Sequence, residues 1–319
     1  MRHMAFSFLF LIFLPFFGFS AFAQGWFDSL NEAKNRLPDS LKTKIDGALS
    51  NESVRRSFEE TQKEFSRALD DISPEEEYYI GRAVAAKILA KYSVLNKPAA
   101  QNYLNKILHS LTVFSERPLL FRDYFVVILD SSEINAFATA GGHIMVTKAL
   151  IDCASSEDEL AAILAHEVGH VLLKHSAKAI KSARLGGAIS KAGGVAALAL
   201  SENQKENNAD AVRAEIDAAV TGVIETGYSQ AQELSADSKA LELLDGAGYD
   251  PRSFEGVLKS LQSRSSKSDK SGFGKTHPSP SVRLKNVSIR YRYYPDSSSY
   301  SPSSARSARF LEFKKALEK

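Results

Sequence analysis

Apolar side chains recur every three or four residues along several stretches of this chain, which is the spacing of helices that bury one face. The stretches with the clearest repeat are Pro74–Tyr92, Ala99–Thr112 and Tyr228–Leu244. A polar, weakly periodic segment precedes them at 24–70. A polar linker at Ser297–Ser307 leads to a final predicted helix at Ala308–Lys319.

Short apolar runs between these helices predict strands. Tyr124–Leu129 is rich in β-branched and aromatic residues. Ile134–Phe137 and His143–Thr147 flank the pair Gly141-Gly142, so they are predicted to form a hairpin or two sheet strands. The whole pattern predicts an α+β fold that is mostly helical and contains a small mixed β-sheet.

Another helix is predicted after Ser156, because Ser156 and Glu159 have the spacing of a capping box. Apolar residues then continue at helical spacing, namely Leu160, Ile163, Leu164, Val171 and Leu172. Inside this helix lies His166-Glu167-Val168-Gly169-His170, which reads H-E-x-x-H. The apolar neighbours argue against the alternative, a chance cluster of polar residues on a solvated face.

The H-E-x-x-H pattern has a specific chemical meaning. Residues four apart lie on one helix face, so His166 and His170 can direct two imidazoles at one metal ion. Glu167 lies beside them, where its carboxylate can accept a proton from an attacking water. Two nitrogen ligands, an adjacent base and an open coordination position are what a zinc hydrolase requires.

A catalytic zinc ion normally has three protein ligands, so a third ligand must lie elsewhere. The predicted helix Tyr228–Leu244 carries Glu233 and Asp237 one turn apart on one face. We expect Glu233 to be the third ligand. We expect Asp237 to accept the free ring N–H of His166, which would fix the tautomer of that ligand. Without the first motif, this pair would instead indicate a solvated acidic face.

These motifs, taken together, resemble a known family. H-E-x-x-H followed by E-x-x-A-D is similar to the gluzincin peptidases that include the CAAX prenyl proteases, the HtpX heat-shock peptidase and the BepA-like periplasmic metallopeptidases. Three further segments match, namely Asn135–Gly142 (N-A-F-A-x-x-G-G), Gly227-Tyr228-Ser229 and His277–Arg283 (H-P-S-x-x-x-R). The resemblance covers about residues 71–290. It implies a zincin-like metallopeptidase domain with the sheet beside the zinc helix and one Zn²⁺ per chain.

The resemblance also suggests roles that the residues alone do not. His277 would be a fourth metal ligand that holds the enzyme shut, or it would aid catalysis with Arg283 as a donor to the oxyanion; an ordinary loop histidine is the third alternative. Polypeptide substrate is expected to add as a strand along Asn135, Ala136 and Phe137. The chain departs from the family in the Gly/Ala-rich insert 181–226, which has no counterpart, and at Ser235, where many relatives carry an acid.

Composition narrows the function further. The formal net charge of +2 gives no electrostatic basis for binding nucleic acid. Basic residues in Arg283–Arg292 alternate with apolar ones and are expected on the outer face of a terminal helix or strand. Cys153 is the only cysteine, so an internal disulfide is excluded, and its apolar neighbours predict that it is a buried small hydrophobe.

The first residues predict export. Arg2 and His3 precede the apolar run Met4–Phe19, and Ala21-Phe22-Ala23 offers small residues at the two positions that signal peptidase reads. We expect cleavage after Ala23 and a periplasmic or other extracytoplasmic location. The alternative is an uncleaved signal that anchors the chain in the membrane. Association with the membrane is compatible with the sequence but is not required by it.

These observations predict a signal peptide at 1–23, an N-terminal helical extension at 24–70, a zinc metallopeptidase domain at 71–296 and a polar linker with a C-terminal helix at 297–319. The predicted function is a zinc-dependent endopeptidase, with Glu167 as its base, that cleaves unfolded or misassembled exported proteins. The alternatives are a chaperone-like binder with a closed zinc site and a membrane-anchored peptidase. An intact Glu167 disfavours the binder, because binding alone needs no general base.

Overall fold

The computed structural model describes residues 71–184, 227–264, 276–277, 280–300 and 304–318, together with Glu52, Arg56, 221–222 and 224–225. The predicted signal peptide lies outside the described residues, as do nearly all of the extension 24–70 and most of the insert 181–226. Ile72–Ile180 and Ala218–Lys319 belong to one compact unit, which contains the elements described below.

A three-stranded mixed sheet lies inside this unit, as the sequence predicts. Its strands are β1 (Phe125–Leu129), β2 (Ala136–Ala138) and β3 (His143–Thr147), in the order β1-β3-β2. Strand β1 runs parallel to β3, whereas β2 is antiparallel to β3 and forms an edge of the sheet.

The turn between β2 and β3 depends on two glycines. It forms a short 3-10 helix, η1 (Ala140–Gly142), in which Gly141 and Gly142 have φ angles of 73° and 87°. A Cβ atom on Gly141 would lie 2.5 Å from the Cα of Tyr78. Glycine is therefore required both for the left-handed backbone and for the close approach of helix α5 (Pro74–Leu89), which carries Tyr78.

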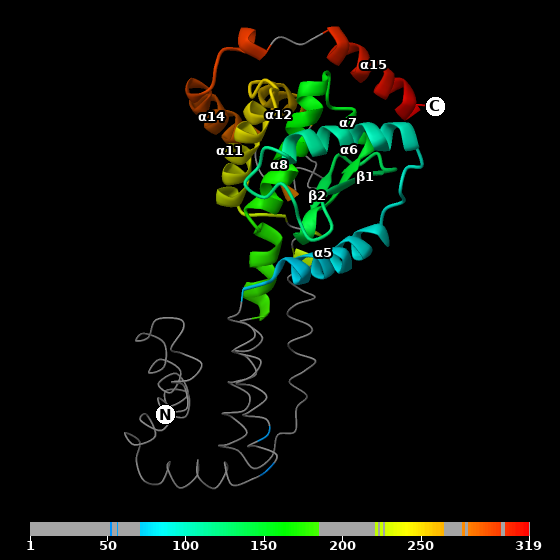
Figure 1. Ribbon diagram of the computed structural model, residues 1–319, viewed down its shortest axis with the longest axis vertical. Helices are drawn as coiled ribbons and strands as arrows, with labels where there is room; N and C mark the ends of the chain where they lie inside the picture. The colour runs from blue at the N-terminus through cyan, green and yellow to red at the C-terminus, as the bar shows by residue number, and fades with distance from the viewer. Residues whose placement is uncertain are drawn as a thin grey trace. The chain divides into compact units, whose positions relative to one another are not determined.

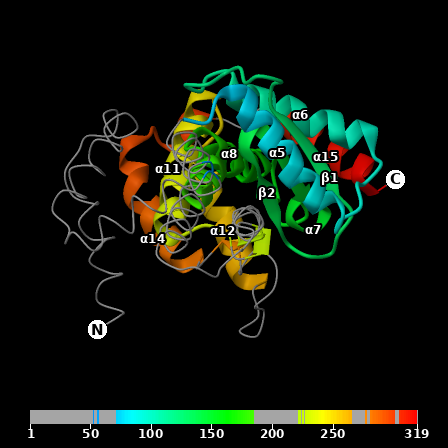
Figure 2. The same ribbon diagram turned by 90° about the horizontal axis from the view of Figure 1, so that it is seen from below.

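Helices cover both faces of the sheet (Figures 1 and 2). Helix α5 (Pro74–Leu89) packs on the face that carries Phe137 and Met145. Helices α6 (Pro98–Thr112) and α8 (Glu157–Leu172) pack on the opposite face, which carries Ala136, Ala138 and Ile144. The alternation of side chains along each strand thus separates two apolar layers.

Helix α8 carries the H-E-x-x-H motif, and its start differs in one detail from the prediction. The Ser156 side chain accepts a hydrogen bond from the Glu159 backbone N–H, as expected for an N-cap. The Glu159 carboxylate, however, accepts from the N–H of Ser155 at 2.7 Å rather than from that of Ser156. The predicted capping box is therefore only half correct, because the returning bond is shifted by one residue.

Helix α11 (Gln230–Gly246) packs closely against α8. It begins two residues after the predicted start, where Ser229 and Gln232 form a complete capping box. A Cβ atom on Gly169 would lie 2.8 Å from the carbonyl oxygen of Ala236. The glycine inside H-E-x-x-H therefore allows the two helices to approach closely, which brings Glu233 opposite the histidines.

The remaining elements are α7 (Lys148–Ile151), α12 (Ser253–Arg264), α14 (Pro280–Arg290), η2 (Tyr291–Tyr293), η3 (Ser297–Tyr300) and α15 (Ser304–Glu318). Two predictions need correction here. Helix α15 begins at Ser304, four residues before the predicted start, and the segment before it contains a 3-10 helix at Ser297–Tyr300. Arg283 is buried at 1% exposure, so it does not lie on the outer face of its helix.

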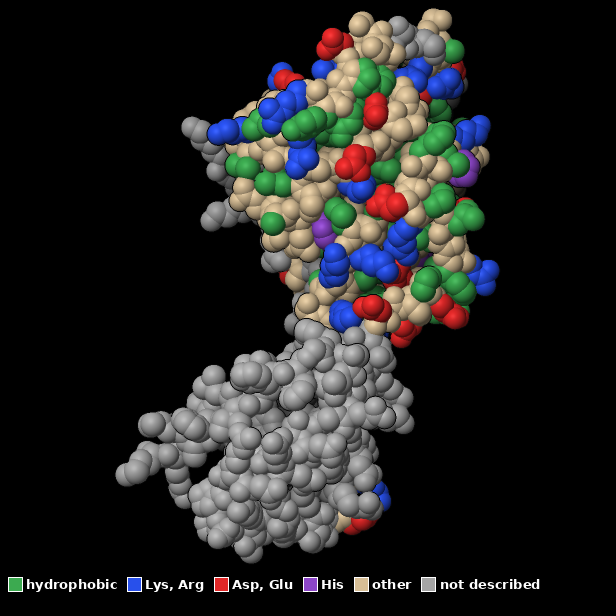
Figure 3. Space-filling view, turned by 60° about the vertical axis from the view of Figure 1, so that its left-hand side comes forward, with side chains coloured by type: hydrophobic (Ala, Val, Ile, Leu, Met, Phe, Trp, Pro, Cys, Tyr) green, Lys and Arg blue, Asp and Glu red, His purple; other side chains and the backbone are tan. Residues whose placement is uncertain are grey.

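The described surface mixes charges of both signs. On the face drawn in Figure 3, Lys and Arg side chains alternate with Asp and Glu side chains, and apolar side chains are scattered among them. No helix in the described ranges combines the length and apolar character needed to cross a membrane. Cys153 is buried at 4% exposure among apolar residues, as predicted.

Candidate metal centre

Four buried side chains converge between α8 and α11. His166 and His170 come from α8, Glu233 comes from the first turn of α11, and His277 precedes α14. Each offers one nitrogen or oxygen atom, and these four atoms all lie within 4.8 Å of one another. The structure therefore brings the three expected ligands together with His277, the candidate fourth ligand.

The spacing within the cluster matches a tetrahedral metal site. Zinc–ligand bonds of 2.0–2.2 Å at tetrahedral angles place neighbouring ligand atoms roughly 3.3–3.6 Å apart. The Nε2 atoms of His166 and His170 are 3.1 Å apart, and those atoms lie 3.4 and 3.3 Å from the Glu233 carboxylate. Nδ1 of His277 is 3.3 Å from Nε2 of His166 and 3.0 Å from both Glu233 oxygens. The donor set fits one zinc ion.

Behind His166 lies a buried carboxylate and a buried cation. Oδ1 of Asp237 is 2.9 Å from Nδ1 of His166. Arg283 donates to both Asp237 oxygens, through Nε at 2.9 Å and Nη2 at 2.6 Å. Its third nitrogen, Nη1, lies 3.4 Å from Glu233. The guanidinium is thus directed at the carboxylates that surround the ligands.

His170 contacts two further residues, His175 and Tyr228, for which no role at the site was predicted. Nδ1 of His175 lies 2.9 Å from Nδ1 of His170. The Tyr228 ring stacks on the His170 ring, with centroids 4.2 Å apart and planes inclined by 22°. A nitrogen acceptor on Nδ1 leaves Nε2 of His170 to face the other donors. In the sequence, His175 is marked only by its nearness to the motif, since it is a third histidine that follows H-E-x-x-H within five residues.

Protonation differs strongly between the two helix histidines. Burial lowers the pKa of His170 to about 3. Burial and the Arg283 charge also oppose protonation of His166, but hydrogen bonds to Asp237 and Glu233 outweigh them and raise its pKa to about 9. Burial opposes ionisation of Glu233, yet the charge of His277 and the bonds to the other histidines hold its pKa well below the usual value. Because a histidine binds a metal ion through a deprotonated nitrogen, cation binding at this site competes with protons.

Glu167 stands apart from the ligands in its environment. Its side chain is buried, and burial raises its pKa above the usual value. Oε1 lies 4.0 Å from Nε2 of His277, while Oε2 has no hydrogen-bond partner among the described residues. A buried carboxylate without full hydrogen bonding is costly to maintain, and such groups concentrate at functional sites.

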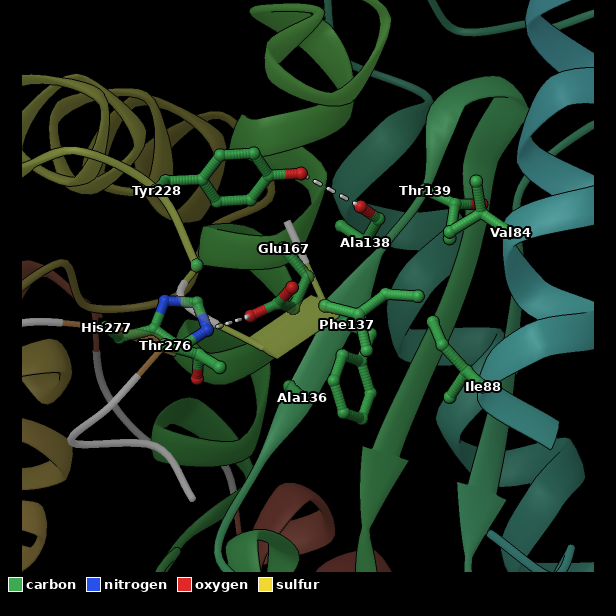
Figure 4. Close-up of a pocket in the computed structure, with 12 residues that line it drawn as sticks. Val84, Ile88, Ala136, Phe137, Ala138, Thr139, Glu167, Tyr228, Thr276 and His277 are labelled. Carbon is green, nitrogen blue, oxygen red and sulfur yellow. Dashed lines mark hydrogen bonds and ion pairs between the residues drawn. The ribbon is translucent and has the colours of Figure 1, made fainter. Parts of the chain in front are cut away.

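A small pocket opens beside Glu167 and reaches the edge of the sheet (Figure 4). Its walls are mostly apolar and are contributed by Val84, Ile88, Ala136, Phe137, Ala138, Thr139, Ile224, Gly227, Tyr228, Thr276 and His277. The predicted substrate edge therefore lies next to the predicted base. Asn135, which directly precedes β2, is buried, and its side chain accepts a hydrogen bond from the Thr276 hydroxyl at 3.0 Å.

Comparison with known proteins agrees with this geometry. The sequence profile described as Peptidase family M48 matches residues 98–290, which is more than half of the chain. The match bears out the predicted family and the prediction of a metallopeptidase with a zincin-like fold.

Three similar proteins illustrate the range of relatives. The beta-barrel assembly-enhancing protease of Escherichia coli (strain K12) is 24% identical over 67% of this chain and 44% of its own length. Metalloprotease YcaL of the same organism is 31% identical over 50% of this chain and 59% of its own length. The mitochondrial metalloendopeptidase OMA1 of Schizosaccharomyces pombe is 24% identical over 69% of this chain and 63% of its own length. The chain thus spans less than half of the first of these relatives.

Proposed function

The chain belongs to peptidase family M48, and on this premise we propose that it is a zinc-dependent endopeptidase that cleaves unfolded or misassembled exported proteins. The observation that carries the proposal is the convergence of His166, His170 and Glu233 on one point, with the buried Glu167 beside it. Together these groups supply the ligands and the base of a metal-assisted hydrolysis.

Each residue has a distinct part in the proposed reaction. His166, His170 and Glu233 would hold one zinc ion, which when bound polarises the peptide carbonyl and lowers the pKa of water. Glu167 accepts the proton of the attacking water and returns it to the leaving amine. Asp237 fixes the tautomer of His166, and Arg283 holds Asp237 in place. These contacts support a positioning role for Arg283, which we propose in place of the alternative role as a donor to the oxyanion.

His277 is proposed to close the site as a fourth ligand. Its Nδ1 atom lies inside the donor cluster, at the same spacing as the other three groups. In this position it occupies the place that a water or a substrate carbonyl would need. His277→Ala should therefore raise basal proteolysis, including cleavage of the chain itself. His109→Ala, on the exposed side of α6, should change nothing. A His277→Ala rate lowered 100-fold or more, on the order of one lost oxyanion donor, would assign the opposite role.

The substrate class is inferred from the edge strand and the relatives. Addition of a strand to β2 relies on backbone hydrogen bonds, so it selects extended chains rather than a particular sequence. One relative is named as a beta-barrel assembly-enhancing protease, and we take this name as support for a substrate among exported proteins. We propose that this chain acts in the periplasm after cleavage behind Ala23. N-terminal sequencing of the exported protein should begin at Gln24, whereas an intact Met1 would favour a membrane anchor.

Cleavage of unfolded casein by the exported protein tests the activity. We expect proteolysis that a chelator abolishes and added zinc restores. Glu167→Gln should lower the rate by about 10²–10⁴-fold, since it removes the general base. It should leave the zinc content unchanged, because Glu167 is not a ligand. A Glu167→Gln protein that cleaves casein at the wild-type rate would refute the mechanism. Casein that binds but is never cleaved would favour the chaperone-like alternative.

A further inference from the structure

We propose that the Tyr228 hydroxyl is a latch on the substrate edge, because it occupies a backbone carbonyl of β2 that an incoming peptide strand must use. The proposal rests on the proposed function, in that it takes β2 to be the edge that receives substrate. It adds a residue that controls access to that edge and assigns a role to a side chain that stacks on His170 and lines the pocket.

The strand register determines which backbone groups of β2 face outward. The Asn135 carbonyl accepts from the Thr147 N–H, and the Thr139 N–H donates to the His143 carbonyl. In an antiparallel pair such residues alternate with residues whose backbone groups point away from the partner strand. Ala136 and Ala138 therefore direct their N–H and C=O groups at the free edge, where a peptide would pair.

Tyr228 already holds one of these outward groups. Its hydroxyl donates to the Ala138 carbonyl at 3.2 Å, across the pocket that contains Glu167 (Figure 4). A peptide pairing with Ala138 would donate its own N–H to the same oxygen. Because the phenol and the peptide approach that oxygen from the same free edge, the phenol must leave before the peptide can pair.

The backbone around Tyr228 keeps the latch in place. Gly227 has a φ of 70°, and a Cβ atom there would lie 1.7 Å from the Thr276 carbonyl oxygen. The next N–H, that of Tyr228, donates to the same oxygen at 3.3 Å. Stacking on His170 holds the other side of the Tyr228 ring. The ring is thus fixed by contacts that do not involve its hydroxyl.

This separation makes Tyr228→Phe a direct test, since phenylalanine keeps the ring and removes the hydroxyl, which contacts Ser176 as well as the Ala138 carbonyl. The measurement is steady-state cleavage of an internally quenched unfolded peptide, with zinc content and the melting temperature as checks of the site and the fold. We expect KM to fall about 2- to 10-fold, the range of one net hydrogen bond. We expect kcat to stay within about twofold, because the latch acts before the chemical step. An unchanged or raised KM would overturn the proposal. So would a tenfold loss of kcat, which would place the hydroxyl on the reacting groups.

The matched control is Tyr124→Phe. The Tyr124 hydroxyl also donates to a backbone carbonyl, that of Arg117 at 2.9 Å, and the residue lines neither the pocket nor the ligand cluster. It should leave KM unchanged. Binding of the same peptide to Glu167→Gln, with and without Tyr228→Phe, tests the latch separately from cleavage. The dissociation constant should fall by the same 2- to 10-fold. A wild-type protein that never cleaves would count against the proposed function alone, whereas equal dissociation constants would count against the latch alone.

Discussion

Helix α8 buries a glutamate near each end, and the surroundings of the two side chains are opposite. At the N-terminus, Glu157 is buried at 3% exposure and receives hydrogen bonds from Arg309 at 2.6 Å, from Tyr249 at 3.2 Å and from Tyr103. Tyr103 comes from α6, Arg309 comes from α15, and Tyr249 lies in the loop after α11. The carboxylate therefore joins distant segments around the start of α8.

Three turns later, Glu167 is buried at 1% exposure without comparable partners. Its Oε1 atom lies 4.0 Å from Nε2 of His277, and burial raises the pKa of Glu167. A carboxylate that accepts hydrogen bonds from a cation and two hydroxyls has a structural role, because its partners hold it in place. One that is buried without them is poised to take up a proton. The comparison shows how a single helix can be anchored at one end and reactive at the other.

The largest effect should come from removing a ligand at the reactive end. Glu233→Ala should abolish both metal binding and proteolysis, because it deletes the only carboxylate in the donor cluster. Glu242→Ala is the matched control on the same helix, since Glu242 is 57% exposed and bonds to Lys239. Metal analysis after dialysis checks both variants. Equal metal content in wild type and Glu233→Ala would show that Glu233 is not a ligand, and the contrast between a metal site and a structural anchor along α8 would be lost.

The side chains that meet around the metal site could be predicted from the sequence as two local pairs. The contacts that anchor the N-terminus of α8 could not be predicted in this way. His166 with His170, and Glu233 with Asp237, are each one helical turn apart, so periodicity alone places each pair on one face. The contact between Glu157 and Arg309 joins positions 152 residues apart, and only the packing of α15 creates it. Periodicity could not place His277 either, since it lies 111 residues from His166, and only the resemblance of His277–Arg283 to H-P-S-x-x-x-R pointed to it.

His175 was missed for a different physical reason. It follows His170 by five residues, which is not the spacing of a continuous helical face. Helix α8 ends at Leu172, and Lys174 takes a left-handed conformation with a φ of 56°. This turn brings His175 back to Nδ1 of His170. The three strands, by contrast, could be predicted from their short apolar runs, and Gly141 and Gly142 mark the turn between β2 and β3.

The groups behind the ligands should give a smaller effect than the ligands themselves. Asp237→Asn should lower metal affinity about 10- to 100-fold, since it weakens the bond that orients His166. His175→Phe should have an effect in the same range through His170, and His175→Asn should restore part of it by offering an acceptor oxygen. Competition with a chromogenic chelator measures these affinities. Unchanged affinity in both Asp237→Asn and His175→Phe would show that the ligands need no outer partner.

At the anchored end, Glu157→Gln should affect stability rather than catalysis. The variant keeps the shape but loses the charge that Arg309 and the tyrosines bind, which should cost about 1–3 kcal/mol of unfolding free energy. Since the Arg309 side chain is 54% exposed, we expect the lower part of that range. Urea unfolding measures the loss, and kcat/KM below the transition should match wild type. A Glu157→Gln protein that keeps its stability but loses activity would break the comparison.

The smallest effect concerns Asp152, which precedes α8 and accepts a hydrogen bond from Lys314 of α15. Burial opposes ionisation of Asp152, but hydrogen bonds from Lys148 and Lys314 outweigh it and lower the pKa of this carboxyl. A pKa lowered on folding stabilises the protein above the unfolded value of about 3.9, and that contribution is lost as pH falls through the folded pKa.

Asp152→Asn should therefore cost up to about 1 kcal/mol at pH 7, because the pair is partly exposed. The difference from wild type should shrink below about pH 4 as Asp152 itself becomes protonated. Urea midpoints at the two pH values measure it. Asp296→Asn, at a position 92% exposed beside Arg252, should show no such pH dependence. A loss that is equal at both pH values would mean that the lysines contact Asp152 without stabilising its charge. The anchoring of α15 would then depend on Glu157 and on the apolar contacts of Phe313 and Leu317.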